Sequence, residues 1–461
     1  MKKTLLLGSL AALFAAPVGV AAVDTAQYED MDGLTCTNVW AHGKFFDKDE
    51  FLGFEFTGTN KARTATIVGD KVVVGFSRTM EDGEATSDFA HICKFDLATG
   101  KFLGLVQVTC DGEPVKGLLC ANQVGTDYYG NVWMAGLNSD ASKTPITIYH
   151  ITDLETGTAE IAAQLMIPES EAEFGGRHDY YDLAGDVTGK EDGTVFMSAL
   201  ASGTEPADGK LQGKTVMGWV REQGSDEWNA HFNDGDYVCG EMEDSYPADL
   251  VKWNGAPVVG IARDDDQPLG SLFYVDPFVG YPTLYNTSGA MIESFADADA
   301  DALPKAGPNG VCEFTLGDDT YLAYAFSDYD SNPYCTFTVA KMGENKSFEG
   351  MHKLWTLPAK AFGDTGDGGS RVISIKAVTE TDANGVQGVH LFGYKSMNGL
   401  GLYTIAPAGF QSSLGAGAAL TVVEDSNAPV EYFNLQGIRI SEPTQGLCIR
   451  RQGNNVEKIV K

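Results

Sequence analysis

The sequence predicts an all-β protein: a β-propeller of six blades, with seven as the alternative count, followed by a small C-terminal β-hairpin module. Three observations support this prediction. One apolar segment that follows a tight polar turn recurs six times along the body of the chain. Runs with the period of a helix are nearly absent from that body. Each repeat also contains enough short alternating segments for a sheet of four antiparallel strands.

The recurring segments lie about 61 to 68 residues apart, a period that points to one sheet per repeat. Four short strands cannot bury both of their faces alone, whereas sheets arranged radially each pack on two neighbours. The rival architecture is an array of β-sandwiches. The segments are GDKVVVGFS (69–77), YGNVWMAGL (129–137), DGTVFMSAL (192–200), NGAPVVGIA (254–262), DDTYLAYAF (318–326) and VQGVHLFGY (386–394).

Within each unit the elements follow a fixed order. A β-rich segment such as TATIV or GVCEFTL comes first, then the turn, the recurring strand, a longer loop and a third strand such as AHICKFD. The first five units add a fourth strand, but the sixth stops after GLYTIAP. We expect the N-terminal segment EFLGFEF (Glu50 to Phe56) to supply the missing strand, which would avoid an exposed sheet edge.

The N-terminus predicts export. Residues 1–22 combine Lys2 and Lys3, an apolar stretch and small residues before a cleavage site, as a secretory signal peptide does. No later run reaches the roughly 18 apolar residues of a spanning helix, so we expect no transmembrane segment. The predicted propeller occupies residues 23–407, and the Gly, Ala and Ser content of residues 408–429 predicts a linker.

The C-terminal segment 430–461 resembles the sorting segment of proteins exported by the type IX (Por-type) secretion pathway of Gram-negative bacteria. The resemblance rests on Tyr432, the run Asn434-Leu435-Gln436-Gly437, Pro443, Gly446, Lys458 and Lys461, whereas Cys448 stands where the family usually has an aromatic residue. It implies the export machinery as a partner, and a secreted or outer-surface location after passage through the periplasm. The body resembles secreted β-propeller repeat proteins. Without the resemblance, FNLQGIRI and GLCIRRQG predict a terminal β-hairpin.

Charge and cysteine content narrow the classes of function. The chain has 32 basic and 64 acidic residues, so we expect it to repel nucleic acid and anionic membrane surfaces. Its eight cysteines show no CxxC and no metal-like spacing. Several of them sit in apolar strands, where a buried free thiol is natural. Only Cys110 and Cys120, which close a short loop, are easily joined in a disulfide.

We expect the binding site on the face that carries the loops between second and third strands and the links between blades. These loops are long, polar and aromatic, and variable loops on a rigid scaffold are where sites concentrate. Aromatic rings stack on sugars or peptides, and charged groups fix polar atoms. The alternative is that the cluster at 177–182 only packs against a neighbouring blade. The candidate ligand-binding residues are Arg177, His178, Asp179, Tyr180, Arg78, Arg263, Asp264, Tyr246, Asp328 and Tyr329.

We expect no cofactor. The alternative is calcium at Asp297, Asp299 and Asp301, which alternate like the first ligands of an EF-hand loop, although Ala302 and Pro308 stand where that loop needs Gly and Glu.

No serine-hydrolase elbow, HExxH, phosphate loop or kinase motif is present in the sequence. We therefore expect an exported or cell-surface, non-catalytic binding module for extracellular glycan or protein ligands. The alternative is a glycan-active hydrolase or lyase that uses carboxylates on the loop-rich face. A structural envelope component is a third reading.

Overall fold

The described part of the chain falls into two compact units, which divide between Leu414 and Gly415. This boundary lies inside the predicted linker. Among the described residues, no helix has the length and apolar character that crossing a membrane requires. The computed structural model describes residues 24–43, 46, 61–83, 85–167, 176–202, 216–230, 258–264, 267–276, 283–286, 291–294, 310–326, 335–363, 373–414, 430–433, 439–440, 447–452 and 455–460.

The described residues of the first unit form five sheets of four strands and one sheet of six. The four-stranded sheets are β2–β5 (Ala62–Val68, Lys71–Asp82, Ala85–Asp96, Phe102–Gln107), β12–β15 (Arg177–Gly185, Thr194–Ser202, Val216–Arg221, Trp228–Ala230), β16–β19 (Val258–Asp264, Gln267–Asp276, Thr283–Asn286, Met291–Ser294), β20–β23 (Val311–Leu316, Asp319–Phe326, Thr336–Lys341, His352–Leu357), and β24–β26 (Ile373–Thr381, Gln387–Lys395, Gly399–Pro407) with β1 (Leu34–Gly43). A 3₁₀-helix over Glu344–Lys346 precedes β23.

The six-stranded sheet contains the four strands expected of a repeat and two additions. Its main strands are β8–β11 (Gln123–Thr126, Val132–Ala135, Ile146–Asp153, Thr158–Leu165). The short strands β6 (Thr109–Cys110) and β7 (Glu113–Pro114) extend it, because β6 pairs in parallel with β11 and β7 pairs with β6. The link into this repeat therefore covers an edge that would otherwise be exposed.

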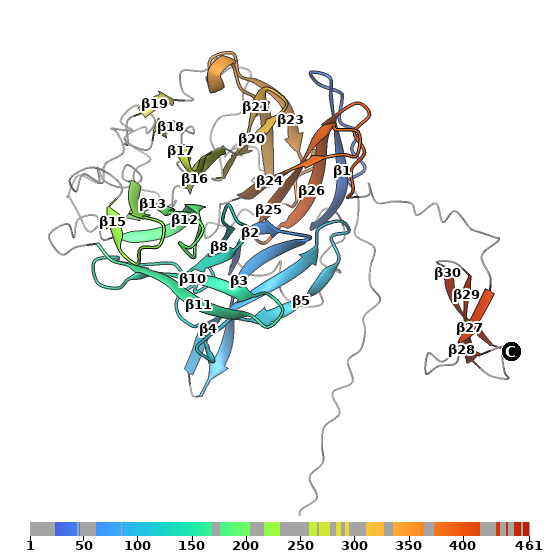
Figure 1. The fold of residues 1–461 in the computed structure, drawn as a ribbon, viewed down its shortest axis with the longest axis horizontal. Coiled ribbons are helices and arrows are strands. Elements are labelled where there is room, and N and C mark those ends of the chain that lie inside the picture. The colour runs from blue at the N-terminus through green and yellow to red at the C-terminus, as the bar shows by residue number, and fades with distance from the viewer. Residues whose placement is uncertain are drawn as a thin grey trace, which may run out of the picture. The chain divides into compact units, whose positions relative to one another are not determined.

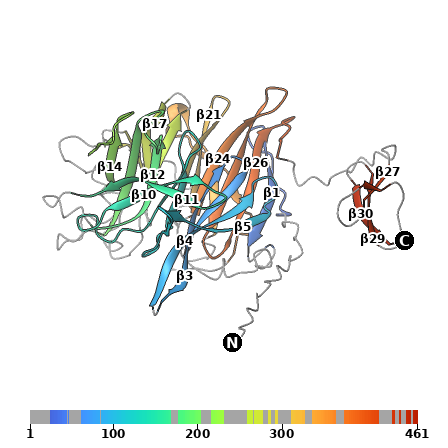
Figure 2. The same cartoon turned by 60° about the horizontal axis from the view of Figure 1, so that its bottom comes forward.

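One edge strand of each sheet faces a common centre. Contacts join these edge strands in a closed cycle that runs β2, β8, β12, β16, β20, β24 and back to β2. Figure 1 shows the sheets of the first unit arranged around this centre, and Figure 2 shows them from another side. Antiparallel sheets that each pack on two neighbours in a closed cycle form a β-propeller. The predicted all-β propeller is confirmed, and the sandwich array is wrong.

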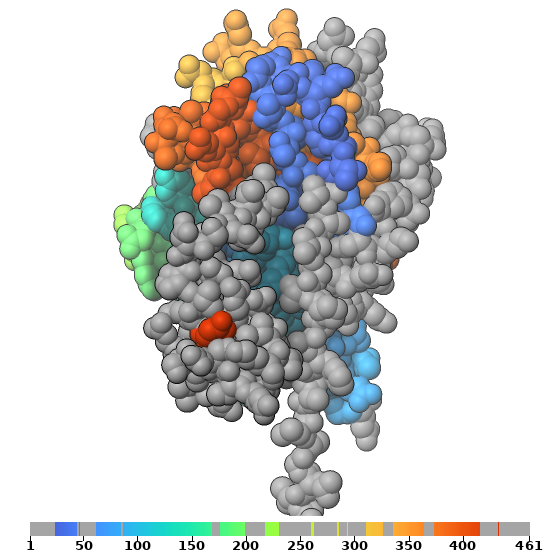
Figure 3. Space-filling view, turned by 90° about the vertical axis from the view of Figure 1, so that its right-hand side faces the viewer, coloured from blue at the N-terminus to red at the C-terminus, as the bar shows by residue number. Residues whose placement is uncertain are grey.

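The first and last strands of the propeller pair and close it. Strand β1 pairs with β26 from Leu34 opposite Pro407 to Gly43 opposite Gly399. In Figure 3 the blue N-terminal residues lie beside the orange-red residues of this sheet.

The prediction that Glu50 to Phe56 supplies this strand is wrong, since β1 takes the position, and the predicted segment lies outside the described residues. A bulge between Asn38 and Trp40 breaks the alternation of β1 and made this strand hard to recognise.

The core fills the spaces between neighbouring sheets. Trp133 of β9, Tyr181 of β12 and Phe196 of β13 belong to one buried cluster that joins two sheets. The rings of Tyr181 and Phe196 stack with 5.2 Å between centroids. A sheet that is covered on both faces needs apolar side chains on both, and all four residues of β9, VWMA, are accordingly buried. The recurring apolar segments are therefore core strands.

The polar turn between β8 and β9 is held by the side chain of Asp127. The carboxylate of Asp127 accepts backbone hydrogen bonds from Tyr129 and Asn131 within its own turn. Its Oδ2 also accepts a 2.8 Å hydrogen bond from the backbone N–H of Val187 in the next repeat. Such turns are a known use of Asp, and here one of them also ties two sheets together.

One predicted loop is wrong. In the first repeat, the longer loop expected between second and third strands corresponds to SRTMEDGEATSD (77–88). This segment lies largely in β3 and β4, which pair from Lys71 opposite Asp96 to Asp82 opposite Ala85. This hairpin projects beyond the neighbouring sheets in Figures 1 and 2. Its polar residues misled the prediction because a projecting hairpin is solvated on both faces, and its strands then carry loop-like composition.

The first residues of the predicted linker contact the last sheet of the propeller. The Asp382 Oδ2 atom accepts a 3.0 Å hydrogen bond from the backbone N–H of Gln411. The Glu380 Oε1 atom accepts a 2.7 Å bond from the backbone N–H of Ser413. The ring of Phe410 lies 6.3 Å from that of His390. Residues 408–414 thus belong to the first unit.

The second unit contains one sheet of four described strands, in the order β28-β27-β29-β30. These strands are β27 (Val430–Phe433), β28 (Arg439–Ile440), β29 (Leu447–Gln452) and β30 (Asn455–Val460). The predicted single hairpin is too small, because FNLQGIRI itself contributes to two strands and β30 was not expected. The pairing of β27 with β29 is antiparallel, as the prediction required.

The described cysteines of the first unit are free thiols, including Cys110 and Cys120, so the disulfide between these two is wrong. Cys120 is buried and its Sγ lies 3.4 Å from the backbone oxygen of Asp88, to which it donates. Burial raises the pKa of Cys120 to about 12. The residue is therefore a small buried apolar group rather than a reactive thiol.

Candidate functional site

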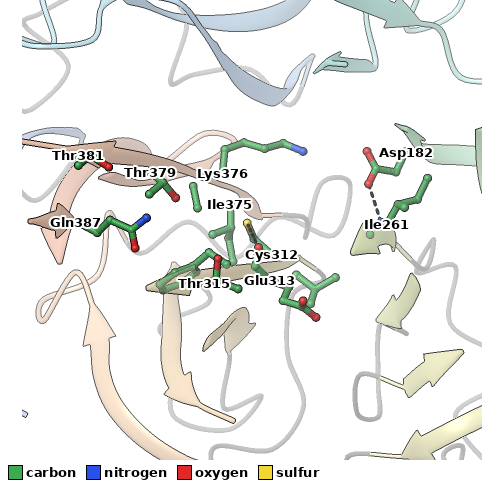
Figure 4. A pocket seen from close by; sticks show the side chains of 14 residues that line it. Asp182, Ile261, Cys312, Glu313, Thr315, Ile375, Lys376, Thr379, Thr381 and Gln387 are labelled. Atoms are coloured by element: carbon green, nitrogen blue, oxygen red, sulfur yellow. Dashed lines mark hydrogen bonds between the residues drawn. The ribbon is translucent and has the colours of Figure 1, made fainter. Parts of the chain in front are cut away.

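A cavity of about 510 Å³ lies where the edge strands β12, β16, β20 and β24 approach one another. Such a volume falls within the roughly 300–1,000 Å³ range of small-molecule sites. Figure 4 shows side chains from opposite walls directed into it. The polar lining residues are Asp182, Cys312, Glu313, Thr315, Lys376, Thr379, Thr381 and Gln387.

The cavity has a buried end and an exposed end. Asp182 and Ile261 are 6% and 7% exposed and form the buried end. Thr315, Thr381 and Gln387 are exposed. Thr381 ends β24 and Gln387 begins β25, so the exposed end lies beside the short turn between them. This is the face of short turns, whereas we predicted the site on the opposite, loop-rich face.

Two carboxylates line the cavity, and both are held by structural hydrogen bonds. Asp182 accepts a 3.0 Å bond from the backbone N–H of Leu183 at Oδ1 and a 2.7 Å bond from that of Ile261 at Oδ2. Glu313 Oε1 lies 2.8 Å from the Nζ atom of Lys346, and the Glu313 side chain is only 3% exposed. A buried carboxylate needs such partners to remain charged.

The remaining polar groups of the lining donate hydrogen bonds. The hydroxyls of Thr315, Thr379 and Thr381 have no hydrogen-bond partner among the described residues. Gln387 accepts a 3.2 Å bond from the backbone N–H of Gly317 at Oε1, which leaves its NH₂ group as a donor. Lys376 adds an ammonium group, which extends into the cavity in Figure 4. The lining therefore suits a ligand rich in oxygen acceptors.

The densest predicted cluster lies in β12, not in a loop. Arg177 pairs with Asp179 through two hydrogen bonds of 2.6 and 2.7 Å. The hydrogen bond to Asp179 raises the pKa of Arg177. His178 and Tyr180 are buried, and His178 Nδ1 lies 2.9 Å from the Ser198 hydroxyl. These four residues organise the strand that presents Asp182, and none of them lines the cavity.

The structure describes only some of the other predicted residues. Arg78 is an exposed residue of β3 and does not line the cavity. Arg263 and Asp264 end β16, where Asp264 pairs with Gln267. Tyr246, Asp328 and Tyr329 lie outside the described residues, so their predicted role stays a prediction.

Metal binding also stays a prediction. Asp297, Asp299 and Asp301 lie outside the described residues. In the part of the chain that the structure describes, no three His, Cys, Asp or Glu side chains gather in an arrangement that could hold a metal ion.

Sequence reasoning missed Glu313, Lys376 and Gln387. Two of them carried a readable signal. Glu313 interrupts the apolar strand VCEFTL, and Lys376 interrupts ISIKAV. A charged residue inside a first strand of the repeat has to find a partner or border a cavity, because such residues are almost never fully buried unpaired. Gln387 carried no such signal, since it begins a strand beside a polar turn.

No protein-family model and no curated protein matches the chain. Among solved structures, the chain is similar to a DUF4623 family protein from Bacteroides eggerthii, with 16% identity, a TM-score of 0.49, and coverage of 83% of this chain and 77% of that one. It is also similar to the polysaccharide lyase Uly1, with 10% identity, a TM-score of 0.35, and coverage of 85% and 90%.

A third similar structure is the β-propeller domain of Cps50 (Swd1) from Myceliophteria thermophila, with 9% identity, a TM-score of 0.34, and coverage of 87% and 96%. At these identities and scores, the three likenesses carry no argument about activity.

Proposed function

We propose that the protein is an exported, non-catalytic binding module that holds an extracellular glycan in the cavity between β12, β16, β20 and β24. The observation that carries the proposal is the donor-rich lining of that cavity, where three threonine hydroxyls, one amide and one ammonium group have no committed acceptor. Sugars present hydroxyl and ring oxygens that accept such bonds. A protein ligand, the other class that the sequence suggests, would have to insert a segment into the same cavity.

The state of the two lining carboxylates favours binding over hydrolysis. A glycosidase needs a pair of carboxyl groups about 5–5.5 or 6.5–9.5 Å apart, one of which donates a proton while the other attacks or activates water. Asp182 is held by two backbone N–H groups and Glu313 by Lys346. The alternative, a glycan-active hydrolase or lyase, would depend on carboxylates of the loop-rich face such as Asp264 and Asp328.

The blade count is part of the proposal. We count the sheet of β6–β11 as a blade together with the five four-stranded sheets. Six blades agree with the six recurring segments in the sequence. The cycle of edge strands from β2 to β24 supports the same count.

The proposed destination is the cell exterior. Removal of residues 1–22 on export and recognition of residues 430–461 by type IX export machinery would deliver the propeller to the medium or the outer surface. The excess of acidic residues supports an extracellular ligand other than nucleic acid. Deletion of residues 430–461 should retain the protein inside the cell envelope, which fractionation and immunoblotting would detect. Unchanged export of the truncated protein would contradict this part.

A glycan array run beside an activity screen on the same glycans tests the proposed function. We expect saturable binding without cleavage. Thr379→Val removes one cavity hydroxyl and should weaken binding, whereas Thr152→Val on β10, away from the cavity, is the matched control. Cleavage of a bound glycan would favour the hydrolase or lyase alternative. If the two variants weaken binding equally, the cavity is not the binding site.

A further inference from the structure

Lys376 stands out because no described residue pairs with its side chain. Its side chain lines the cavity and is only partly buried. It makes no ion pair or hydrogen bond with any described residue. In Figure 4 it extends from β24 toward the wall that carries Asp182. No hydrogen bond or ion pair with a described residue therefore explains why this ammonium group lies in the cavity.

Many of the described lysines pair with a carboxylate, whereas Lys376 does not. Seven described lysines have a carboxylate oxygen within 2.8 Å, namely Lys61, Lys71, Lys94, Lys116, Lys143, Lys341 and Lys346. Acidic residues outnumber basic ones by 64 to 32, so partners are abundant. A lysine at a surface loses little by remaining unpaired, since water solvates it. A lysine that enters a cavity loses part of that hydration.

The carboxylates of the same cavity do not neutralise Lys376. Asp182 directs its two oxygens to backbone N–H groups. Glu313 is paired with Lys346 on its own sheet. The ammonium group of Lys376 thus has no carboxylate partner among the described residues. It lies beyond the neutral donors Thr379, Thr381 and Gln387 when one enters from the exposed end.

The geometry points to an acidic sugar as the ligand, with its carboxylate on Lys376 and its hydroxyls toward the threonines and Gln387. This inference rests on the proposed function, because it names the class of glycan for the same cavity. An ammonium group favours a carboxylate over a neutral hydroxyl, since charge-assisted hydrogen bonds are roughly twice as strong as neutral ones. The acidic surface of the protein disfavours a dense polyanion. The ligand should therefore insert a single uronate residue.

Isothermal titration of the purified protein with three matched trisaccharides tests the inference. The probes are a uronate trimer, its fully methyl-esterified form, which keeps the hydroxyls and loses the charge, and an amino-sugar trimer. We expect the acid to bind about tenfold more tightly than the ester, the factor that one charge-assisted hydrogen bond provides. We expect the amino sugar to bind most weakly.

Variants assign that difference to the lysine. Lys376→Met should abolish the preference for the acid, and Lys376→Arg should keep most of it. Lys353→Met, at an exposed position of strand β23, is the charge-matched control and should change nothing. Because the Lys376 side chain is bonded to no described residue, both of its variants should have the melting temperature of the wild-type protein.

Each outcome separates this inference from the proposed function. If acid and ester bind equally to the wild type, if Lys376→Met keeps the difference, or if the amino sugar binds best, the acidic-sugar inference is wrong while the cavity remains a glycan site. If no trimer binds and the glycan array is also empty, the proposed function fails as well.

Discussion

Asp182 and Ile261 join two neighbouring sheets at the buried end of the cavity: Oδ2 of Asp182 accepts a 2.7 Å hydrogen bond from the backbone N–H of Ile261. The bond crosses from β12 to β16, so one side chain both lines the proposed site and holds its walls together. The shape of the cavity therefore depends on contacts between neighbouring sheets, such as this hydrogen bond.

Asp182→Ala should lower the free energy of unfolding by about 1–3 kcal/mol, because two buried N–H groups lose their acceptor. Asp182→Asn keeps one carbonyl oxygen and should cost less. Denaturant unfolding of the two variants measures the difference. Equal stability of Asp182→Ala and the wild type would show that the bond to Ile261 does not hold these sheets.

Asp127→Ala should destabilise the protein by a similar amount, about 1–3 kcal/mol. It removes the acceptor for Val187 in the next repeat and for two N–H groups in its own turn. Asp70→Ala is the control, because Asp70 lies in the corresponding turn of the first repeat with its side chain 83% exposed. If thermal unfolding shows that both variants lose the same stability, the hydrogen bond from Val187 to Asp127 does not stabilise the contact between repeats.

Trp40→Ala should cost about 3–5 kcal/mol, the range for removing a large buried aromatic side chain. Trp40 is 1% exposed in β1, the strand that closes the propeller. Its Nε1 donates a 2.7 Å hydrogen bond to the backbone oxygen of Leu97, in the turn after β4 of the neighbouring sheet. Trp40→Phe keeps most of the packing and should cost less. If calorimetry shows that Trp40→Ala leaves the stability of the protein unchanged, packing of β1 does not stabilise the closed propeller.

The attachment of residues 408–414 should weaken in acid. Burial alone would raise the pKa of Glu380, but hydrogen bonds from Ser413 and His390 outweigh it, and the pKa lies below the usual value for glutamate. A group with a lowered folded-state pKa stabilises the fold above its unfolded-state pKa and loses that contribution as pH falls through the folded value. The stabilisation should thus be intact at neutral pH and disappear below about pH 4.

Hydrogen exchange at Gln411 and Ser413 as a function of pH measures this attachment. Glu380→Gln should exchange faster at neutral pH and lose the acid-dependent step. A wild-type protein whose exchange, corrected for the intrinsic rate, shows no change between pH 7 and pH 3 would exclude a role for Glu380.

The buried thiols should resist alkylation in the folded protein. Cys93 is fully buried, and burial raises its pKa well above that of a free thiol. Cys110 and Cys312 are partly exposed and should be labelled first by iodoacetamide, with the label located by mass spectrometry. Rapid labelling of Cys93 in the native state would contradict the packing of its sheet.

The repeats made much of the fold predictable. Tight turns followed by apolar runs marked the recurring strands because both sides of each sheet are buried, as in β9. The closing strand could not be identified because the bulge near Asn38 breaks its alternation. The polar ends of β3 and β4 predict a loop, because a projecting hairpin is solvated on both faces and its strands show no apolar alternation.

The site was less predictable than the fold. Asp182 and Lys376 are separated by almost half of the chain, and they line one cavity only because their strands lie at the edges of sheets that surround one centre. The predicted cluster drew attention to 177–182 by its density of polar and aromatic side chains, but Arg177 and Asp179 neutralise each other and Tyr180 is buried. Charge inside an apolar strand, as at Glu313 and Lys376, was the better signal.

The location of a bound glycan tests the central claim most directly. A crystal structure of the protein soaked with the tightest-binding oligosaccharide should show sugar density between Lys376 and Gln387, in the cavity bounded by β12, β16, β20 and β24. Density confined to the loop-rich face, with this cavity empty at saturating ligand, would contradict it.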